Sequence, residues 1–385
     1  MRFLFSSTRG AGHVQPLIPY ARALQQLGHE VIVAAPASVA VKLAESGLSH
    51  AIFDHPGAAA LAPLWSRLNA LTGHAQLSFV MREIFGGRCA EVALPRLLET
   101  LRAFSPDVVV RESAEFASLV AAESLGIAHA RVCVHMASFE EPLVPHMAEA
   151  VDLLRVRLGM APDAGSAIRA EPVFAAFPAS LEDPAVSLAG RVPFRSRMPE
   201  LPTNAHARWA SAAAGKPLVY ITFGTIAGGS PQTQAVYRAA IEAVAELPVR
   251  ALLTTGPAME VGALGVVPDN VQVETWVPQA EVLPHAALVV CHGGSGTVLG
   301  ALAAGVPMVV SPFGADQPHN GQQLARTGAG VVAPGDATSL RAAMRHGLDG
   351  SLRTGAQALA HEIAKMPSHD TAVDAMLALS TAAGR

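Results

Sequence analysis

The residues best suited to chemistry form three short loops in the C-terminal half of the chain. They are Trp276-Val277-Pro278-Gln279, His292-Gly293-Gly294-Ser295-Gly296-Thr297 and Gly314-Ala315-Asp316-Gln317. Glycines that open a helix leave backbone N–H groups accessible to an anion such as a diphosphate, and His292 adds a donor. Trp276 offers an aromatic face to a base, while Asp316 and Gln317 supply the hydrogen-bonding groups that sugar hydroxyls need. Each loop alone is typical of an ordinary α/β turn, but the ordered set predicts a site for a nucleotide diphosphate sugar.

A second candidate is His13, in the turn Gly10-Ala11-Gly12-His13 that follows the first predicted strand. A helix that starts here disfavours a charged imidazole through its dipole, which would keep His13 neutral and able to accept a proton. The alternative is that His13 merely caps that helix. The turn does not fit a dinucleotide fingerprint, because Gln15 stands where glycine is required and the next strand ends at residues 34–36 without an acidic residue.

A histidine base works best beside a carboxylate that fixes its tautomer. Glu112 is the predicted partner, because it follows the strand at 107–110 at the edge where the loop after the first strand also ends. Glu115 is a substitute. Either glutamate could instead be an acid that stabilises the start of the next helix.

Several other chemistries lack their residues. Thr297 occupies the position where a nucleophile elbow requires glycine, and neither a phosphate-binding G-x-x-x-x-G-K-[ST] loop nor an H-E-x-x-H or D-x-D pattern occurs. His319 has no second histidine or cysteine at ligand spacing, which favours a loop residue over a metal ligand. We therefore expect no metal and no cofactor, with the nucleotide sugar acting as a substrate.

The composition is that of a globular protein with two domains. The 385 residues are 51% hydrophobic and 15% charged, and the net charge of -4 gives no basic surface for nucleic acid. Three cysteines without a CxxC pattern favour a reducing compartment. No stretch is long and apolar enough for a signal peptide or a stable membrane insertion. We expect a cytoplasmic protein and leave a homodimer open.

Hydrophobic patterning predicts two doubly wound α/β halves. The first half has predicted strands at 2–6, 30–35 and 107–110, a helix from His13 through Leu27, a turn at 111–113 and a helix at 114–125. The looser segment 36–105 is expected to form a binding cleft or lid. The second half has predicted strands at 218–222, 250–254, 271–275, 288–291 and 307–311, with helices at 232–245 and up to 304. A proline-rich stretch from 161 to 217 connects the halves.

Five apolar residues of the first half are candidates for an acceptor pocket, although residues at helical spacing more often belong to a core. They are Trp65, Phe79, Phe85, Met136 and Phe139.

With these residues in hand, the chain resembles the GT-B glycosyltransferases of family 1, and among them the bacterial enzymes that modify antibiotics, macrolides and other natural products. The resemblance spans the chain and is most specific from Trp276 to Gln317. It implies two Rossmann-like domains facing across a cleft. The N-terminal domain (1–200) would bind a hydrophobic small-molecule aglycone, followed by a linker (201–217). The C-terminal domain (218–368) would hold the donor, with a turn at Gly224-Thr225, and a last helix (369–385) would return to the first domain.

The resemblance also implies a reaction. The transfer would invert the anomeric carbon, with His13 removing the acceptor proton and Glu112 as its carboxylate partner. Plant enzymes that use UDP-glucose carry a glutamate that binds both ribose hydroxyls where this chain has Gly300. A deoxyribose needs no such contact, so we expect a dTDP-activated sugar, such as a 6-deoxysugar, with UDP-glucose as the alternative. Two further functions stay open: a nucleotide-sugar epimerase of the same architecture, and an inactive partner of another transferase.

Overall fold

The computed structural model describes residues 1–188, 190–195, 215–224 and 229–382. The chain divides into two compact units. Unit 1 comprises Met1–Ala176, Pro184–Ser196 and Pro367–Arg385, and unit 2 comprises Phe177–Asp183 and Arg197–Met366. The predicted linker at 201–217 lies outside the described residues except for its last three positions.

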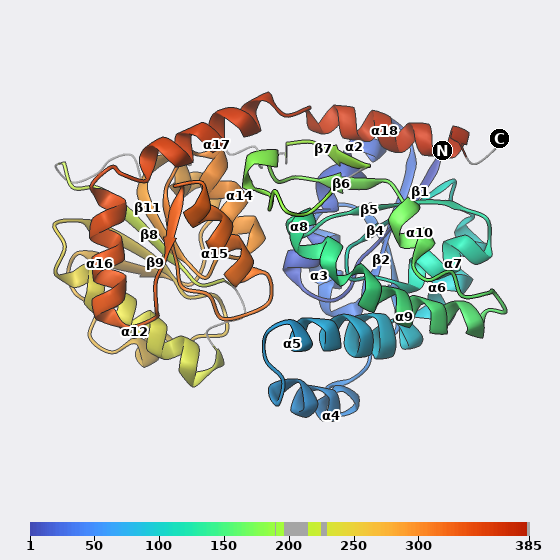
Figure 1. Cartoon of the computed structure of the whole chain (residues 1–385), viewed down its shortest axis with the longest axis horizontal. Helices are drawn as coiled ribbons and strands as arrows, with labels where there is room; N and C mark the ends of the chain where they lie inside the picture. Colours follow the sequence, from blue (N-terminus) through green and yellow to red (C-terminus); the bar gives the residue numbers. More distant parts are fainter. Residues whose placement is uncertain (189, 196–214, 225–228, 383–385) are drawn as a thin grey trace. The chain divides into compact units, whose positions relative to one another are not determined.

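Unit 1 is built on a seven-stranded sheet in the order β3-β2-β1-β4-β5-β6-β7 (Figure 1). All of its strand pairs are parallel. The strands are β1 (Arg2–Ser6), β2 (Glu30–Pro36), β3 (Ser49–Phe53), β4 (Val108–Glu112), β5 (Ala128–Val132), β6 (Val173–Ala175) and β7 (Arg191–Pro193). Chain order reverses between β1 and β4, and at such a switch point the carboxyl ends of the strands form a crevice.

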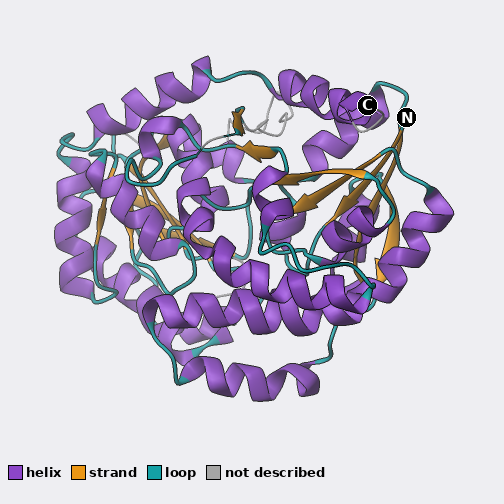
Figure 2. Cartoon of the chain, turned by 45° about the vertical axis from the view of Figure 1, so that its right-hand side comes forward, coloured by secondary structure: helices purple, strands orange, loops and turns teal. Residues whose placement is uncertain are grey.

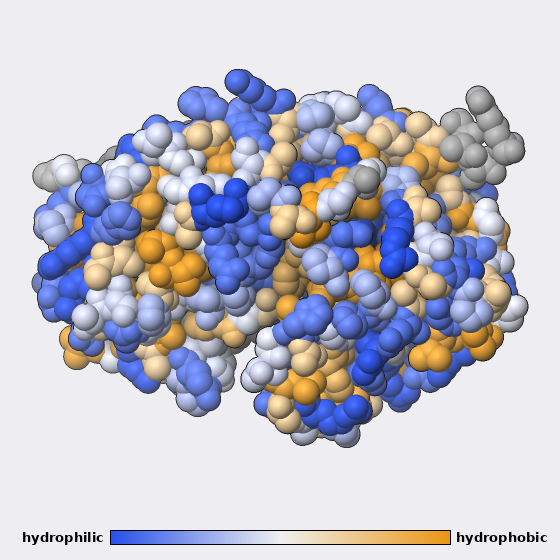
Figure 3. All heavy atoms as spheres, in the orientation of Figure 1, coloured by the Kyte–Doolittle hydropathy of each residue, from blue (hydrophilic) through white to orange (hydrophobic). Residues whose placement is uncertain are grey.

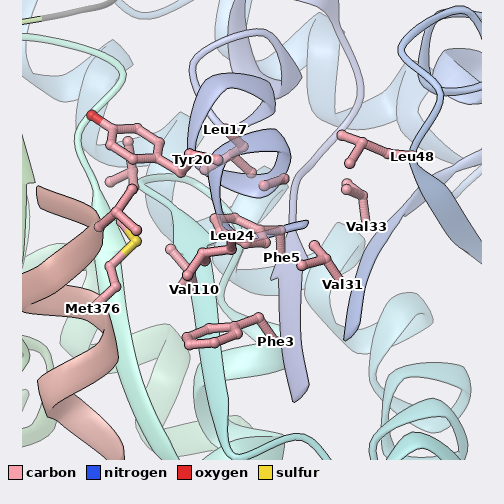
Figure 4. Close-up of a cluster of buried hydrophobic side chains, with 14 of the residues drawn as sticks. Phe3, Phe5, Leu17, Tyr20, Leu24, Val31, Val33, Leu48, Val110 and Met376 are labelled. Atoms are coloured by element: carbon pink, nitrogen blue, oxygen red, sulfur yellow. The ribbon is translucent and has the colours of Figure 1, made fainter. Parts of the chain in front are cut away.

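The helices of unit 1 flank this sheet. They are α1 (Ala11–Val14), α2 (Ile18–Gln26), α3 (Ala40–Glu45), α4 (Ala58–Asn69), α5 (Gly73–Phe79), the π-helix η2 (Val80–Cys89), α6 (Ala90–Phe104), α7 (Ala117–Ser124), α8 (Ala137–Glu140), α9 (Val144–Arg157), α10 (Ser166–Ala170) and α18 (His369–Ala382), with 3₁₀ turns η1 (Ala37–Val39) and η3 (Glu141–Leu143). The last helix packs on α2: Tyr20 stacks on His369 with 4.4 Å between ring centroids, and Met376 is fully buried in the same core (Figure 4).

One predicted helix of unit 1 is wrong. The chain from Ala11 to Gln26 forms two helices, because Pro16 and Pro19 have no N–H to donate and a short turn at 15–17 separates α1 from α2. α1 is therefore a single turn with His13 near its end. The argument that a helix dipole keeps His13 neutral fails, since one turn carries little dipole and His13 is not at its start.

Unit 2 is built on a six-stranded parallel sheet in the order β10-β9-β8-β11-β12-β13, again with helices beside the strands (Figure 2). The strands are β8 (Leu218–Thr222), β9 (Arg250–Thr254), β10 (Val271–Glu274), β11 (Ala286–Cys291), β12 (Met308–Val310) and β13 (Gly330–Val332). The helices are α12 (Pro231–Ala245), α13 (Gln279–Val282), α14 (Ser295–Ala303), α15 (Gln317–Arg326), α16 (Ala337–Leu348) and α17 (Arg353–Lys365), with 3₁₀ turns η4 (Ala179–Leu181), η6 (Val261–Leu264) and η7 (Leu283–His285).

Hydrophilic and hydrophobic side chains are intermixed on the face seen in Figure 3. Among the described residues, no helix combines the length and the hydrophobicity needed to cross a bilayer.

Candidate active site

A histidine and a glutamate meet at the carboxyl ends of the two central strands of unit 1. His13 follows β1, Glu112 ends β4, and the His13 Nδ1 lies 2.9 Å from the Glu112 Oε2. Because an ionised carboxylate only accepts hydrogen bonds, Nδ1 must carry the hydrogen. When the imidazole is uncharged, its lone pair is therefore on Nε2, and the carboxylate fixes this tautomer.

Four donors hold the Glu112 carboxylate. Its Oε1 accepts from the backbone N–H of Thr8 at 3.0 Å and from the Thr8 hydroxyl at 2.8 Å, and its Oε2 accepts from the Ala114 N–H at 2.8 Å as well as from His13. Burial raises the pKa of Glu112, but His13 and these N–H groups more than offset it and lower the pKa to about 2. Glu112 is thus a fully buried, permanently ionised partner for an imidazolium.

Glu115, the alternative partner, does a different job. Its carboxylate accepts from the N–H groups of Ala117 and Ser118 and from the Ser118 hydroxyl, which places it at the start of α7. Burial raises the pKa of Glu115. The substitute is therefore the acid that stabilises a helix start, while Glu112 reaches the histidine.

Aromatic rings lie on two sides of His13. The Phe85 ring is tilted at 5.8 Å from it, and the His135 ring is edge-on at 6.1 Å and contacts Phe139 in turn. Phe85 comes from the π-helix η2, an irregularity that is frequent at functional sites. Charged side chains adjoin His135. The Glu140 Oε1 lies 3.2 Å from the His135 Nδ1, and the Glu140 Oε2 lies 3.6 Å from the Arg131 Nη1.

The five predicted acceptor residues fall into two groups. Phe85 is half-buried beside His13, and Phe139 is mostly buried beside His135. Met136 is fully buried, while Trp65 and Phe79 pack with Leu61, Leu68, Ile84 and Cys89 inside the α4–α5 region. Phe85 lies at His13 and Phe139 at His135, and a role of any of the five in binding an acceptor stays a prediction.

In unit 2, α14 starts directly after β11 without a side-chain cap at Gly294. The N–H groups of its first turn are therefore open to an anion. A Cβ on Gly294 would come within 2.5 Å of the His292 Nε2, whereas one on Gly296 would meet nothing within 4 Å. A Cβ on Gly224, which has a positive φ, would come within 3.1 Å of the same ring. Glycines 224 and 294 thus make room for His292, and Gly296 leaves its surface open.

His292 lies in this glycine loop with its ring stacked on Phe313 at 6.4 Å. Burial lowers the pKa of His292, against the opposing effects of Asp316 and a hydrogen bond with the backbone of Thr222. A neutral imidazole has one N–H donor, and the hydrogen bond to the Thr222 backbone uses it, so the N–H groups of α14 are the donors that stay open to an anion.

Asp316 accepts hydrogen bonds from neighbouring side chains of the glycine loop and of α15. Its Oδ2 accepts from the Ser295 hydroxyl at 2.7 Å and from the Asn320 amide at 2.7 Å, and Asn320 also donates to the Gly293 carbonyl at 2.8 Å. The Gln317 Oε1 accepts from the N–H groups of Phe313 and Gly314, which leaves its amide hydrogens as donors. Asp316 therefore joins the second and third loops into one structure.

The remaining loop carries Trp276, Val277 and Gln279. Trp276 is 63% exposed, which suits a stacking platform, while Val277 is buried beneath it. Gln279 donates to the Thr297 hydroxyl at 3.1 Å. Of the predicted donor residues, only Thr225 lies outside the described residues.

Three residues of these networks were missed from the sequence: Thr8, Asn320 and His135. Thr8 donates two hydrogen bonds to Glu112, 104 residues away, and Asn320 joins Asp316 to the Gly293 carbonyl, neither of which a motif indicates. His135 follows β5 as Glu112 ends β4, so the rule that strand ends meet could have found it. Over the described part of the chain, no group of three or more His, Cys, Asp or Glu residues could hold a metal ion.

The sequence is similar to those of known glycosyltransferases. Residues 238–379 match the family described as "Erythromycin biosynthesis protein CIII-like, C-terminal domain". The chain is 31% identical over 409 positions to elloramycin glycosyltransferase ElmGT from Streptomyces olivaceus, covering 96% of this chain and 94% of that one. A shorter stretch is 34% identical over 173 residues to demethyllactenocin mycarosyltransferase from Streptomyces fradiae, covering 44% of this chain and 37% of that one.

Solved structures give the same result. Glycosyltransferase SnogD from Streptomyces nogalater is 28% identical with a TM-score of 0.78, covering 99% of both chains. Spinosyn rhamnosyltransferase SpnG complexed with thymidine diphosphate is 23% identical with a TM-score of 0.81, covering 98% of this chain and all of that one, and at this identity it shows the fold alone. The named relatives are transferases and not epimerases. The chain therefore belongs to the GT-B glycosyltransferases of antibiotic and other natural-product biosynthesis.

Proposed function

We propose that this glycosyltransferase moves a hexose or deoxyhexose from a dTDP-sugar to a hydroxyl of a hydrophobic natural product, with inversion at the anomeric carbon. The observation that carries the proposal is the His13–Glu112 pair, in which Nδ1 is committed to a buried carboxylate and Nε2 is the basic nitrogen. The Nε2 takes the acceptor's hydroxyl proton while the oxygen bonds to the anomeric carbon. The bond from that carbon to the diphosphate breaks, and Glu112 stabilises the resulting imidazolium.

The departing diphosphate needs stabilisation that this chain can provide without a metal. The uncapped start of α14 offers backbone N–H groups at the loop that carries His292. We infer that turnover does not require a divalent cation. Chelation with EDTA should leave the rate unchanged, and restoration of a lost rate by Mg²⁺ would contradict this inference.

The identity of the nucleotide is inferred from the glycine at position 300. Glycine has no side chain to bind the ribose hydroxyls, and a Cβ here would come within 2.9 Å of the Leu283 Cδ1, so a glutamate would require Leu283 to shift. A deoxyribose without a 2′-hydroxyl suits this site. SpnG was solved with thymidine diphosphate, and relatives include a mycarosyltransferase and an L-demethylnoviosyl transferase, which supports a deoxysugar donor. UDP-glucose is the alternative.

A panel of dTDP, UDP and GDP tests the donor by thermal unfolding. A ligand that binds only the folded state raises the Tm more the more tightly it binds, so dTDP should give the largest rise at equal concentration. A larger rise with UDP would reverse the assignment, and no rise with any nucleotide would contradict the donor site itself. The anomeric configuration of the glycoside, read by NMR, tests inversion.

A further inference from the structure

Arg111 is a fully buried arginine directly beside the carboxylate that orients His13. Side chains alternate between the faces of a strand, so Arg111 and Glu112 leave β4 on opposite sides. The sequence predicts a turn at 111–113, but β4 continues to Glu112 and Arg111 is buried within the strand. Burying a guanidinium is costly unless all of its donors are used.

Every nitrogen of the Arg111 guanidinium has a partner. Nη1 lies 3.3 Å from the Glu112 carbonyl oxygen and 3.2 Å from those of Ser113 and Glu115. Nε donates to the Glu171 Oε2 at 3.1 Å, Nη2 donates to Oε1, and the Phe116 ring lies 5.3 Å from the guanidinium carbon. Arginine alone has five N–H donors in a planar fork, so no other side chain can replace this set.

Glu171 makes the arginine's position rigid. It directly follows α10, far along the chain from Arg111, and it is fully buried. Burial raises the pKa of Glu171, but Arg111, His129 and Arg131 more than offset it and hold the pKa at about 2. Glu171 is therefore a fixed anion against which the fork of Arg111 is aligned.

Stability alone does not explain this pair, because well-packed apolar residues often serve as well as a buried ion pair. What apolar residues cannot do is gather three carbonyl oxygens of one short loop. That loop starts at Glu112, and its Ala114 N–H is one of the donors that hold the Glu112 carboxylate. We propose that Arg111, aligned by Glu171, is a positioning residue for the glycosyl transfer, because it fixes the loop that presents Glu112 to His13. This inference rests on the proposed role of His13 as the base.

The test uses Arg111→Lys and Glu171→Gln in the full chain. Lysine keeps the charge but has three donors, and glutamine keeps the shape of Glu171 but loses its charge. Each variant should lower kcat by about tenfold to hundredfold at nearly unchanged donor KM, the scale of a small misplacement of a catalytic group. Glu171→Gln should have the smaller effect, since Arg111 still donates to the three carbonyls.

A structural signature separates positioning from loss of fold. The Nδ1 proton between His13 and Glu112 should give a proton NMR resonance far downfield, assigned by its loss in His13→Gln. We expect this resonance to shift upfield or broaden away in both variants while each still unfolds in one thermal transition. Arg155→Lys is the matched control: Arg155 contacts Glu123 at 2.6 Å on α7 in the same unit, and it should leave both resonance and kcat unchanged.

An unchanged resonance and kcat in a folded Arg111→Lys protein would overturn the inference. So would an equal effect of Arg155→Lys, because any lost ion pair would then suffice. The proposed function fails separately, if His13→Ala retains normal turnover. In that case the NMR resonance still reports whether Arg111 positions Glu112, so the two failures are distinguishable.

Discussion

The site residues at the two sheet edges differ in the groups that they offer: side chains in unit 1 and backbone N–H groups in unit 2. In unit 1 the site consists of side chains: a buried carboxylate with four donors fixes one imidazole. In unit 2 the predicted anion site is mainly backbone: an uncapped helix start and glycines around His292, held by hydrogen bonds between Asn320, Asp316 and Ser295. The difference follows from the tasks. A proton transfer needs one nitrogen of defined basicity, whereas a diphosphate spreads its charge over many oxygens and is best met by many N–H groups.

This comparison predicts that unit 1 is sensitive to charge and unit 2 to shape. The largest effect is expected at the base. His13→Ala should lower kcat by roughly 10²- to 10⁴-fold, the usual contribution of a general base, because the variant lacks the proposed proton acceptor. Steady-state kinetics with a saturating donor measures this. The Tm rise caused by dTDP should be retained, and near-normal turnover would show that the base is another residue.

A smaller loss is expected for Glu112→Gln, on the order of 10²-fold in kcat, because the imidazole stays while its tautomer is no longer fixed. Glutamine can accept through its oxygen or donate through its amide, so part of the population presents the wrong nitrogen. The control is Glu246→Gln, a surface glutamate of unit 2 that is 57% exposed on its side chain. Full activity of Glu112→Gln would show that His13 does not require the Glu112 carboxylate.

The same carboxylate predicts how stability depends on pH. The pKa of Glu112 is lowered from 4.5 to about 2 on folding, so its ionised form stabilises the native state above pH 4.5. This contribution, about 3 kcal/mol, is lost as the pH falls from about 4.5 toward 2. Thermal unfolding from pH 7 to pH 2 should therefore show a Tm difference between the parent and Glu112→Gln that shrinks with acidification. A constant difference would contradict the lowered pKa.

The sequence reveals the pairing of His13 with Glu112 because topology alone brings the ends of β1 and β4 together. It does not reveal Arg111. The run Val-Val-Val-Arg-Glu predicts a strand that ends before its charged residues. Glu171, the carboxylate that compensates the buried charge of Arg111, lies 60 residues further along the chain. The same limit hid the bond from Asn320 to the Gly293 carbonyl, 27 residues away, while Asp316 as a sugar ligand stays a prediction. Local patterns predict which edges carry function, but not the long-range hydrogen bonds that fix side chains there.

The glycines of unit 2 give the sharpest test of shape. In Gly294→Ala the new methyl group would lie within 2.5 Å of His292, so both the Tm of the free protein and the Tm rise with dTDP should fall. In Gly296→Ala nothing lies within 4 Å of the new methyl group, and alanine in a helix stabilises by about 0.5–1 kcal/mol relative to glycine. The free protein should therefore keep or raise its Tm. Only the dTDP response should weaken, several-fold in apparent affinity, because the methyl group occupies space that the diphosphate needs. If Gly296→Ala binds dTDP as the parent does, the diphosphate does not approach the first turn of α14. The contrast between a side-chain site and a backbone site would then no longer describe the donor end of this enzyme.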